Sequence, residues 1–229
     1  MQLAPEFALD IHAQLTQQAN EGMLNDQQLA LVILANLLQD TRQTESWIHF
    51  DNCAFPDGIE YIAGQWDLIR EIGDPYSTES LGAFGQLLHT VQDFYAHSNW
   101  IELHTNQSPI PVWDLVLSSL PPEIVSGTWF IGHPKRCAAG APTHAQLNKD
   151  SADSAEGSKI VPSGPNQGKS LFQLAFNTAL AATKVQFAHL RAIPVAAGIL
   201  KGTGKALVEG ASQLELLQAF IESMHAIKH

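Results

Sequence analysis

The chain has 229 residues, of which 45% are hydrophobic, and its formal net charge is −11. This length and composition fit one globular domain, or one domain with an extension, and exclude a largely disordered chain. The negative charge argues against a broad surface for extended nucleic acid, because such a surface requires clustered lysine and arginine. No apolar run reaches the roughly 18 residues that predict a membrane span.

Two further features of the composition narrow the chemistry. The N-terminal residues lack the basic segment and apolar core of a cleavable signal peptide, so we expect a cytoplasmic protein, or one exported without such a signal. Cys53 and Cys137 are too few for a disulfide framework and do not form a cysteine zinc pattern. The ten histidines outnumber cysteine and methionine combined. The composition therefore favours a metal site with nitrogen and oxygen ligands over one with sulfur ligands.

Helical periodicity and capping signals predict an all-α, multi-helix bundle. The expected helices, in chain order, are residues 5–20, 25–47, 58–72, 77–99, 112–119, 169–191 and 195–229. Residues 120–168 show little periodicity and predict a long irregular loop, which in a compact domain is usually functional or mobile. We expect one helical metal-binding domain over residues 1–193 and a helical extension over 194–229.

One expected helix carries three regularly spaced ionisable side chains. His89, Asp93 and His97 lie at positions i, i+4 and i+8. Each step of four residues advances about 40° around a helix and roughly 6 Å along it, so all three share one face. The two histidines are then about 12 Å apart, too far to bind one ion together, while Asp93 could bridge two ions. This spacing predicts a cluster of two or three metal ions.

The alternative is a polar surface face, or core histidines satisfied by Asp93. The apolar neighbours predict a buried helix, in which charge must be compensated, and this favours the metal cluster. These neighbours are Leu81, Phe84, Leu88, Phe94 and Trp100. Gly82 and Gly85 precede the polar face and would allow another backbone to approach closely.

Other candidates lie earlier in the chain. Asp40 falls on the apolar stripe of the second expected helix and so points towards the core, although the simpler interpretation is a frayed helix end that pairs with Arg42. His49 lies on a turn. His12 lies on the first helix, where a lone histidine is more often a core residue than a ligand.

Several motifs resemble one known family. Residues 89–100 read HTVQDFYAHSNW, which resembles the signature of the Het-C family of heterokaryon-incompatibility proteins. Residues 35–43 (ANLLQDTRQ), 49–52 (HFDN), 137–140 and 143–150 (THAQLNKD) fit the same family. The resemblance covers about residues 36–150 in patches.

Het-C proteins are in turn distantly similar to zinc-dependent phospholipases C and three-zinc nucleases. The resemblance therefore implies the all-helical fold of those phospholipases. It implies the metal ligands His12, Asp40, His49, His89, Asp93, His97 and His144. His97 would begin a third metal site, with His144 preferred over Glu102 and His104 as its partner. The phospholipase pattern places its last histidine two residues farther on and adds a His-x3-Glu pair that has no counterpart here.

The function that the resemblance implies is metal-dependent hydrolysis of a phosphoester, with Asp40 orienting or deprotonating the attacking water and with a toxic or cell-death role. Zinc is the preferred ion, with manganese or magnesium as alternatives. The expected substrate is a small phosphoester or a phospholipid headgroup. The alternative is a non-catalytic cytotoxic or interaction module with structural metals, which acts through residues 195–229, by membrane association or by binding a partner.

Overall fold

The computed structural model describes residues 9–195. This part of the chain contains helices and no strand, so the fold is all-α, as the sequence predicts. The longer helices are α1 (Leu9–Asn20), α2 (Asp26–Leu37), α3 (Phe55–Ile72), α4 (Thr78–His97) and α7 (Leu171–Ala192). The short ones are α5 (Trp100–Leu103), α6 (His144–Leu147) and the 3-10 helices η1 (Leu38–Thr41), η2 (Asp51–Cys53) and η3 (Leu117–Ser119). No helix among residues 9–195 is long and apolar enough to cross a bilayer.

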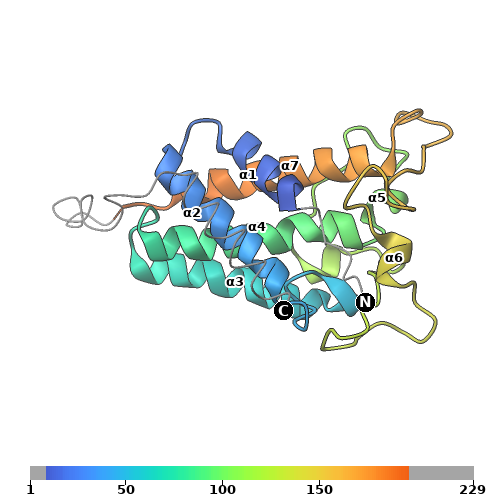
Figure 1. Cartoon of the computed structure of the whole chain (residues 1–229), viewed down its shortest axis with the longest axis horizontal. Helices are drawn as coiled ribbons and strands as arrows, with labels where there is room; N and C mark the ends of the chain where they lie inside the picture. Colours follow the sequence, from blue (N-terminus) through green and yellow to red (C-terminus); the bar gives the residue numbers. More distant parts are fainter. Residues whose placement is uncertain (1–8, 196–229) are drawn as a thin grey trace, which may run out of the picture.

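Helix α4 lies at the centre of the bundle (Figure 1). It packs against α2, α3 and α7, while α1 packs against α2 and α7. Phe84, Leu88 and Phe94 on α4 are almost completely buried. Burying each such side chain contributes about 1.5–3 kcal/mol, so α4 forms the core against which the other helices are placed.

Capping residues define the ends of these helices. Asn25 forms a capping box with Gln28 at the start of α2, and the Ser77 hydroxyl accepts from the backbone N–H of Ser80 at the start of α4. Helix α3 ends at Gly73, whose φ of 74° lies in the left-handed region that glycine tolerates best.

The second predicted helix is shorter than expected. We predicted residues 25–47, but α2 ends at Leu37 and is followed by η1. Ile48, His49 and Phe50 are all buried. They lie in an irregular turn after η1, which places all three inside the fold without a continuous helix. The predicted helix at 112–119 is likewise reduced to η3.

The irregular segments gather at the end of the bundle where α5 and α6 lie (Figure 1). A disulfide between Cys53 and Cys137, 84 residues apart, ties this region to η2. The two cysteines thus form one disulfide and no framework, and sequence reasoning did not foresee this bond because only the folded chain brings them together. The predicted extension lies outside the described residues from residue 196 onward.

Candidate metal centre

Helix α4 presents His89, Asp93 and His97 to the interior, and all three are fully buried. An isolated charge in such a place would cost several kcal/mol, so each group requires a compensating partner. The compensating side chains lie on α1, η1, η2 and α6 and in the turns next to these helices.

The first cluster consists of His12, Asp40, His49, His89 and Asp93. The two carboxylate oxygens of Asp93 face different histidines: Oδ1 lies 3.2 Å from His12 Nε2, and Oδ2 lies 3.0 Å from His89 Nε2. His49 Nδ1 is also 3.0 Å from Asp93 Oδ2, and Asp40 Oδ1 is 3.9 Å from His89 Nε2. Asp93 therefore lies between two ligand groups, as a bridging carboxylate would.

Close packing between α2 and α4 gives the first cluster its shape. A Cβ on Gly85 would meet the Val32 carbonyl oxygen and would lie 2.7 Å from Ala35 Cβ. Only glycine therefore lets α2 approach closely enough for Asn36 and Asp40 to reach the polar face of α4. Gly82, in contrast, has nothing within 4 Å. Arg42, which we considered as a partner for Asp40, forms an ion pair with Glu45.

Electrostatics in the first cluster favours a positive charge. Burial tends to raise the pKa of Asp93, but His89, His97 and His12 outweigh it and hold that pKa well below its usual range. Burial tends to lower the pKa of His12, yet the charges of Asp93 and Asp40 raise it to about 9. The pKa of His89 falls to about 4 through burial and the neighbouring His12 and His49. The carboxylates thus attract one cation into the cluster, a role that a metal ion can take from a proton.

The second cluster consists of Asp51, His97, His144 and Asp150. His144 Nδ1 lies 3.0 Å from Asp51 Oδ1, and His97 Nε2 lies 3.0 Å from Asp150 Oδ1. His144 Nε2 is 4.0 Å from Asp150 Oδ2. All four side chains are buried.

Burial lowers the pKa of both histidines of the second cluster, but the nearby carboxylates reverse the effect. The pKa of His97 lies well above its usual value because of Asp93, Asp150 and Asp51. The pKa of His144 is raised chiefly by Asp51. The second cluster therefore also attracts a cation.

Residue 49 links the two clusters. The His49 side chain belongs to the first cluster, while its backbone carbonyl accepts a hydrogen bond of 3.0 Å from His97 Nδ1. This bond leaves Nε2 of His97 to face Asp150. Metal-binding histidines commonly donate one ring N–H to a carbonyl in this way, which fixes the other nitrogen as the ligand atom.

The turn that carries His49 and Asp51 has an unusual backbone. Phe50, Asn52 and Cys53 have φ values of 51°, 55° and 56°, a conformation that costs energy for residues other than glycine. The Asn52 amide holds the turn in place, because its Nδ2 donates to the carbonyls of Trp129 and Gly132 and its Oδ1 accepts from the Trp129 N–H. The irregular region thereby fixes the position of Asp51.

Asp150 is held by the residue before it. Lys149 is fully buried, and its Nζ donates to the carbonyls of Ser98 and Leu147 and to Glu102 Oε1, at 2.8 to 2.9 Å. Its backbone N–H donates to the Ala96 carbonyl. This attachment to the end of α4 sets Asp150 against His97.

All seven predicted ligands are brought together by the fold. Five lie in the first cluster, and His97 and His144 lie in the second. The other two residues that we considered as partners of His97 bind elsewhere. Glu102 pairs with Lys149, and His104 Nδ1 donates to the Trp100 carbonyl. Sequence reasoning missed Asp51 and Asp150 as candidate ligands. Both lie inside the motifs that carry the Het-C resemblance, and this was the signal that could have identified them.

Three groups of side chains in the described part of the chain could hold a metal ion. Within each group the ligand atoms lie within 4.8 Å of one another. The groups are His12 with His89 and Asp93, Asp40 with His49 and His89, and Asp51 with His97 and His144. Two buried carboxylate oxygens face histidine nitrogens: Asp93 Oδ1 lies 3.2 Å from His12 Nε2, and Asp150 Oδ2 lies 4.0 Å from His144 Nε2.

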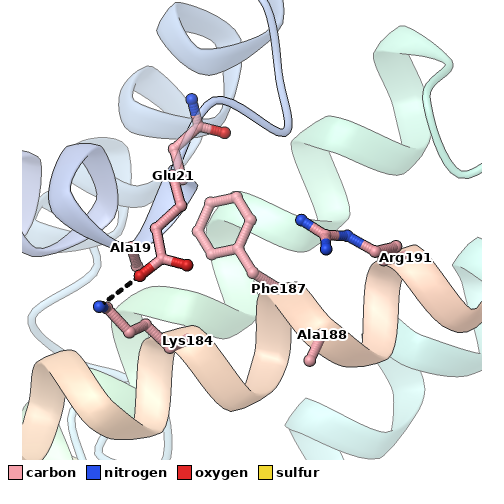
Figure 2. Close-up of a pocket in the computed structure, with 7 residues that line it drawn as sticks. Ala19, Glu21, Lys184, Phe187, Ala188 and Arg191 are labelled. Carbon is pink, nitrogen blue, oxygen red and sulfur yellow. Dashed lines mark hydrogen bonds and ion pairs between the residues drawn. The ribbon is translucent and has the colours of Figure 1, made fainter.

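Two surface cavities lie apart from these clusters. One, of about 310 Å³, is lined by Trp47, Asp57, Glu60 and Tyr61. The other, of about 150 Å³, lies between the end of α1 and α7 (Figure 2). There Lys184 pairs with Glu21, and Phe187 and Arg191 complete the wall. Neither cavity is lined by a residue of the two clusters.

Comparison with known families gives one match. Residues 10–120, just under half of the chain, are similar to the family described as the VWA7 N-terminal domain. This range contains the whole first cluster, together with Asp51 and His97, but not His144 or Asp150. Comparisons with curated proteins and with solved structures give no match. The Het-C resemblance therefore stays a prediction.

Proposed function

We propose that this protein is a metal-dependent phosphoester hydrolase, similar to zinc-dependent phospholipases C and three-zinc nucleases. The observation that carries the proposal is the pair of His/Asp clusters joined by α4 and by the turn at residue 49. This arrangement offers three ligand groups, two of which share His89, around one buried face of α4. A lone structural ion would need only one of them.

Zinc is the ion that we propose for these groups, because imidazole nitrogen and carboxylate oxygen together suit it well. Bound ions would polarise a phosphoryl oxygen and lower the pKa of a water molecule towards 7. Manganese or magnesium would be favoured only if oxygen ligands dominated.

Asp40 is the residue that we propose to orient or deprotonate the attacking water. Its side chain is 10% exposed, whereas that of Asp93 in the same cluster is completely buried. Asp40 therefore lies nearer the surface than Asp93, although its two carboxylate oxygens are themselves buried. This position supports a catalytic role for Asp40, beside its role as a ligand.

We propose a small phosphoester or a phospholipid headgroup as the substrate. The net charge of −11 disfavours the long polyanionic backbone of nucleic acid. The resemblance of residues 36–150 to Het-C proteins supports a toxic or cell-death role.

The test combines metal analysis with a panel of phosphoesters. Purified protein should contain stoichiometric zinc and hydrolyse a phosphodiester or phosphocholine reporter, and Asp40→Asn should lower the turnover at least tenfold while most of the metal is retained. Asp26→Asn, at the exposed start of α2, is the matched control. A folded, zinc-loaded protein that hydrolyses none of the panel would contradict the proposal.

A second function is favoured by the burial of the clusters. Most of their side chains are less than 5% exposed, and closed sites of this kind are typical of structural metals. The protein would then be a cytotoxic or interaction module that acts through residues 195–229, nearly all of which lie outside the described part of the chain. Deletion after Pro194 should remove toxicity and leave the metal content unchanged. Toxicity that survives this deletion but not Asp40→Asn would favour the hydrolase.

A further inference from the structure

A buried amide lies beside the first cluster. Gln92 on α4 is fully buried, and its Oε1 lies 2.7 Å from His12 Nδ1 and 3.0 Å from Asn36 Nδ2. Its Nε2 donates to the hydroxyls of Thr16 on α1 and Thr183 on α7, at 3.3 and 3.2 Å. Gln92 on α4 therefore connects α1, α2 and α7 beside the first cluster.

Thr183 fixes which way the Gln92 amide points. The Thr183 hydroxyl donates its hydrogen to the Ala179 carbonyl at 2.7 Å. Its oxygen can then only accept a hydrogen bond from Gln92, so the Nε2 end of the amide must face α7. The Oε1 end must consequently face His12.

The direction of the amide determines which nitrogen of His12 carries hydrogen. Because Oε1 can only accept, His12 Nδ1 must be the donor in the 2.7 Å contact. Nε2 of His12 then points at Asp93 Oδ1, 3.2 Å away. A lone pair and a carboxylate oxygen at this distance repel each other unless a proton or a metal ion lies between them, and a metal ion that binds here takes the place of that proton.

Asn36 acts on His89 in the same manner. Its Nδ2 donates to Gln92 and to Thr16, so its Oδ1 faces His89 Nδ1 at 3.2 Å. His89 therefore also presents Nε2 to Asp93, at 3.0 Å. One amide network thus sets both histidines of the first metal-ligand group in the same tautomer.

We propose that Gln92, oriented by Thr183, is a positioning residue that commits Nε2 of His12 to the metal ion. The inference rests on the metal centre of the proposed function, but not on its hydrolytic activity. Losing such an outer partner typically lowers metal affinity 10–100-fold. Thr183 would exert its effect from α7 without approaching the ion.

The test uses two substitutions at Thr183 that change a single side-chain group, and one at Gln92 that removes all contacts of the amide. Thr183→Val removes the hydroxyl, Thr183→Ser keeps it, and Gln92→Leu removes the amide. Thr178→Val is the matched control, because Thr178 lies on the same helix, is buried, and makes the same hydrogen bond to the carbonyl four residues earlier. Zinc affinity is measured by competition with a chelator, and the His12 tautomer by long-range ¹H–¹⁵N spectra of zinc-loaded protein.

Wild-type protein, Thr183→Ser and Thr178→Val should show His12 bound to zinc through Nε2. Thr183→Val and Gln92→Leu should bind zinc about 10–100-fold more weakly at the site that His12 reports. Wild-type affinity in folded Thr183→Val and in folded Gln92→Leu would overturn the inference, and so would binding through Nδ1. If Gln92→Leu does not fold, the two Thr183 variants decide.

Failure of the proposed function is distinguishable from failure of this inference. Folded wild-type protein that binds no zinc would overturn both. Protein that binds zinc but hydrolyses no phosphoester would overturn only the proposed hydrolase activity. The zinc affinities of the variants would still test the positioning role of Gln92.

Discussion

The Oδ1 atom of Asp93 lies 3.2 Å from the Nε2 atom of His12, and both side chains are completely buried. Asp93 is on α4 and His12 is on α1, so this contact joins the first helix of the described chain to the centre of the bundle. The second oxygen of Asp93 serves His89 and His49.

Asp93→Asn should therefore empty the first cluster. The substitution keeps the shape of the side chain and removes the charge that faces His12, His49 and His89. We expect zinc per chain, measured by mass spectrometry after dialysis against buffered zinc, to fall by the whole content of the first cluster. Asp67→Asn, at an exposed carboxylate on α3, should leave it unchanged. Retention of the wild-type zinc content by folded Asp93→Asn would contradict the bridging role.

Asp150→Asn should remove one ion and leave the first cluster intact. Asp150 contacts His97 in the second cluster, 3.0 Å away, and reaches His144 at 4.0 Å. We expect the zinc content to fall by about one equivalent, with the same result for Asp51→Asn. Asp153→Asn, which is exposed in the same loop, is the control. A loss of all the zinc would show that the clusters cannot be filled separately.

Lys149→Met should destabilise the fold. The buried Lys149 ammonium satisfies two backbone carbonyls and Glu102, and methionine leaves all three without that donor. We expect the free energy of unfolding in urea to fall by about 3 kcal/mol. Lys184→Met, in an ion pair with Glu21 whose two side chains are 44% and 59% exposed, should change it by less than about 0.5 kcal/mol. Equal effects of the two substitutions would refute the structural role of Lys149.

Two glycines of α4 should respond in opposite ways to alanine. Gly82→Ala places a methyl group in open space and should stabilise the protein by up to about 1 kcal/mol, because alanine is the better helix former. Gly85→Ala forces α2 away from α4, and should lower both the melting temperature and the zinc affinity of the first cluster. Stabilisation of both variants would contradict the close packing of α2 against α4 at Gly85.

Removing the disulfide should weaken the irregular region and the second cluster. Replacing Cys53 and Cys137 by serine releases a link between residues 84 positions apart, which typically costs about 2–4 kcal/mol. Asp51 lies two residues from Cys53, so we expect the second cluster to lose zinc at lower chelator concentrations. Wild-type protein treated with a mild reductant should behave in the same way. Unchanged chelator sensitivity would separate the disulfide from the metal centre.

The sequence predicted the parts of this molecule that depend on local regularity. The spacing of His89, Asp93 and His97 predicted a shared face on one helix, and α4 has that face. The bounds of α4 and α7 also agree with the prediction to within about two residues, because serine caps both helices.

The parts that depend on distant contacts were missed. Asp51 becomes a neighbour of His144 only because Phe50 and Asn52 adopt left-handed backbone conformations and Asn52 binds residues 129 and 132. Asp150 reaches His97 only because Lys149 is fastened to the end of α4. No periodicity in residues 120–168 encodes these contacts. The same applies to the bond between Cys53 and Cys137, which follows from the path of the whole loop.

His49 gives a ring nitrogen to one cluster and a backbone carbonyl to the other. An ion that fixes its ring also fixes the carbonyl that orients His97, so filling the first cluster should raise the affinity of the second. Because such coupling is reciprocal, an ion in the second cluster should tighten binding in the first by the same factor. The protein would then load its metals with positive cooperativity, and Asp150→Asn, although it leaves the first cluster filled, should let a chelator remove that metal at lower concentrations than in wild-type protein.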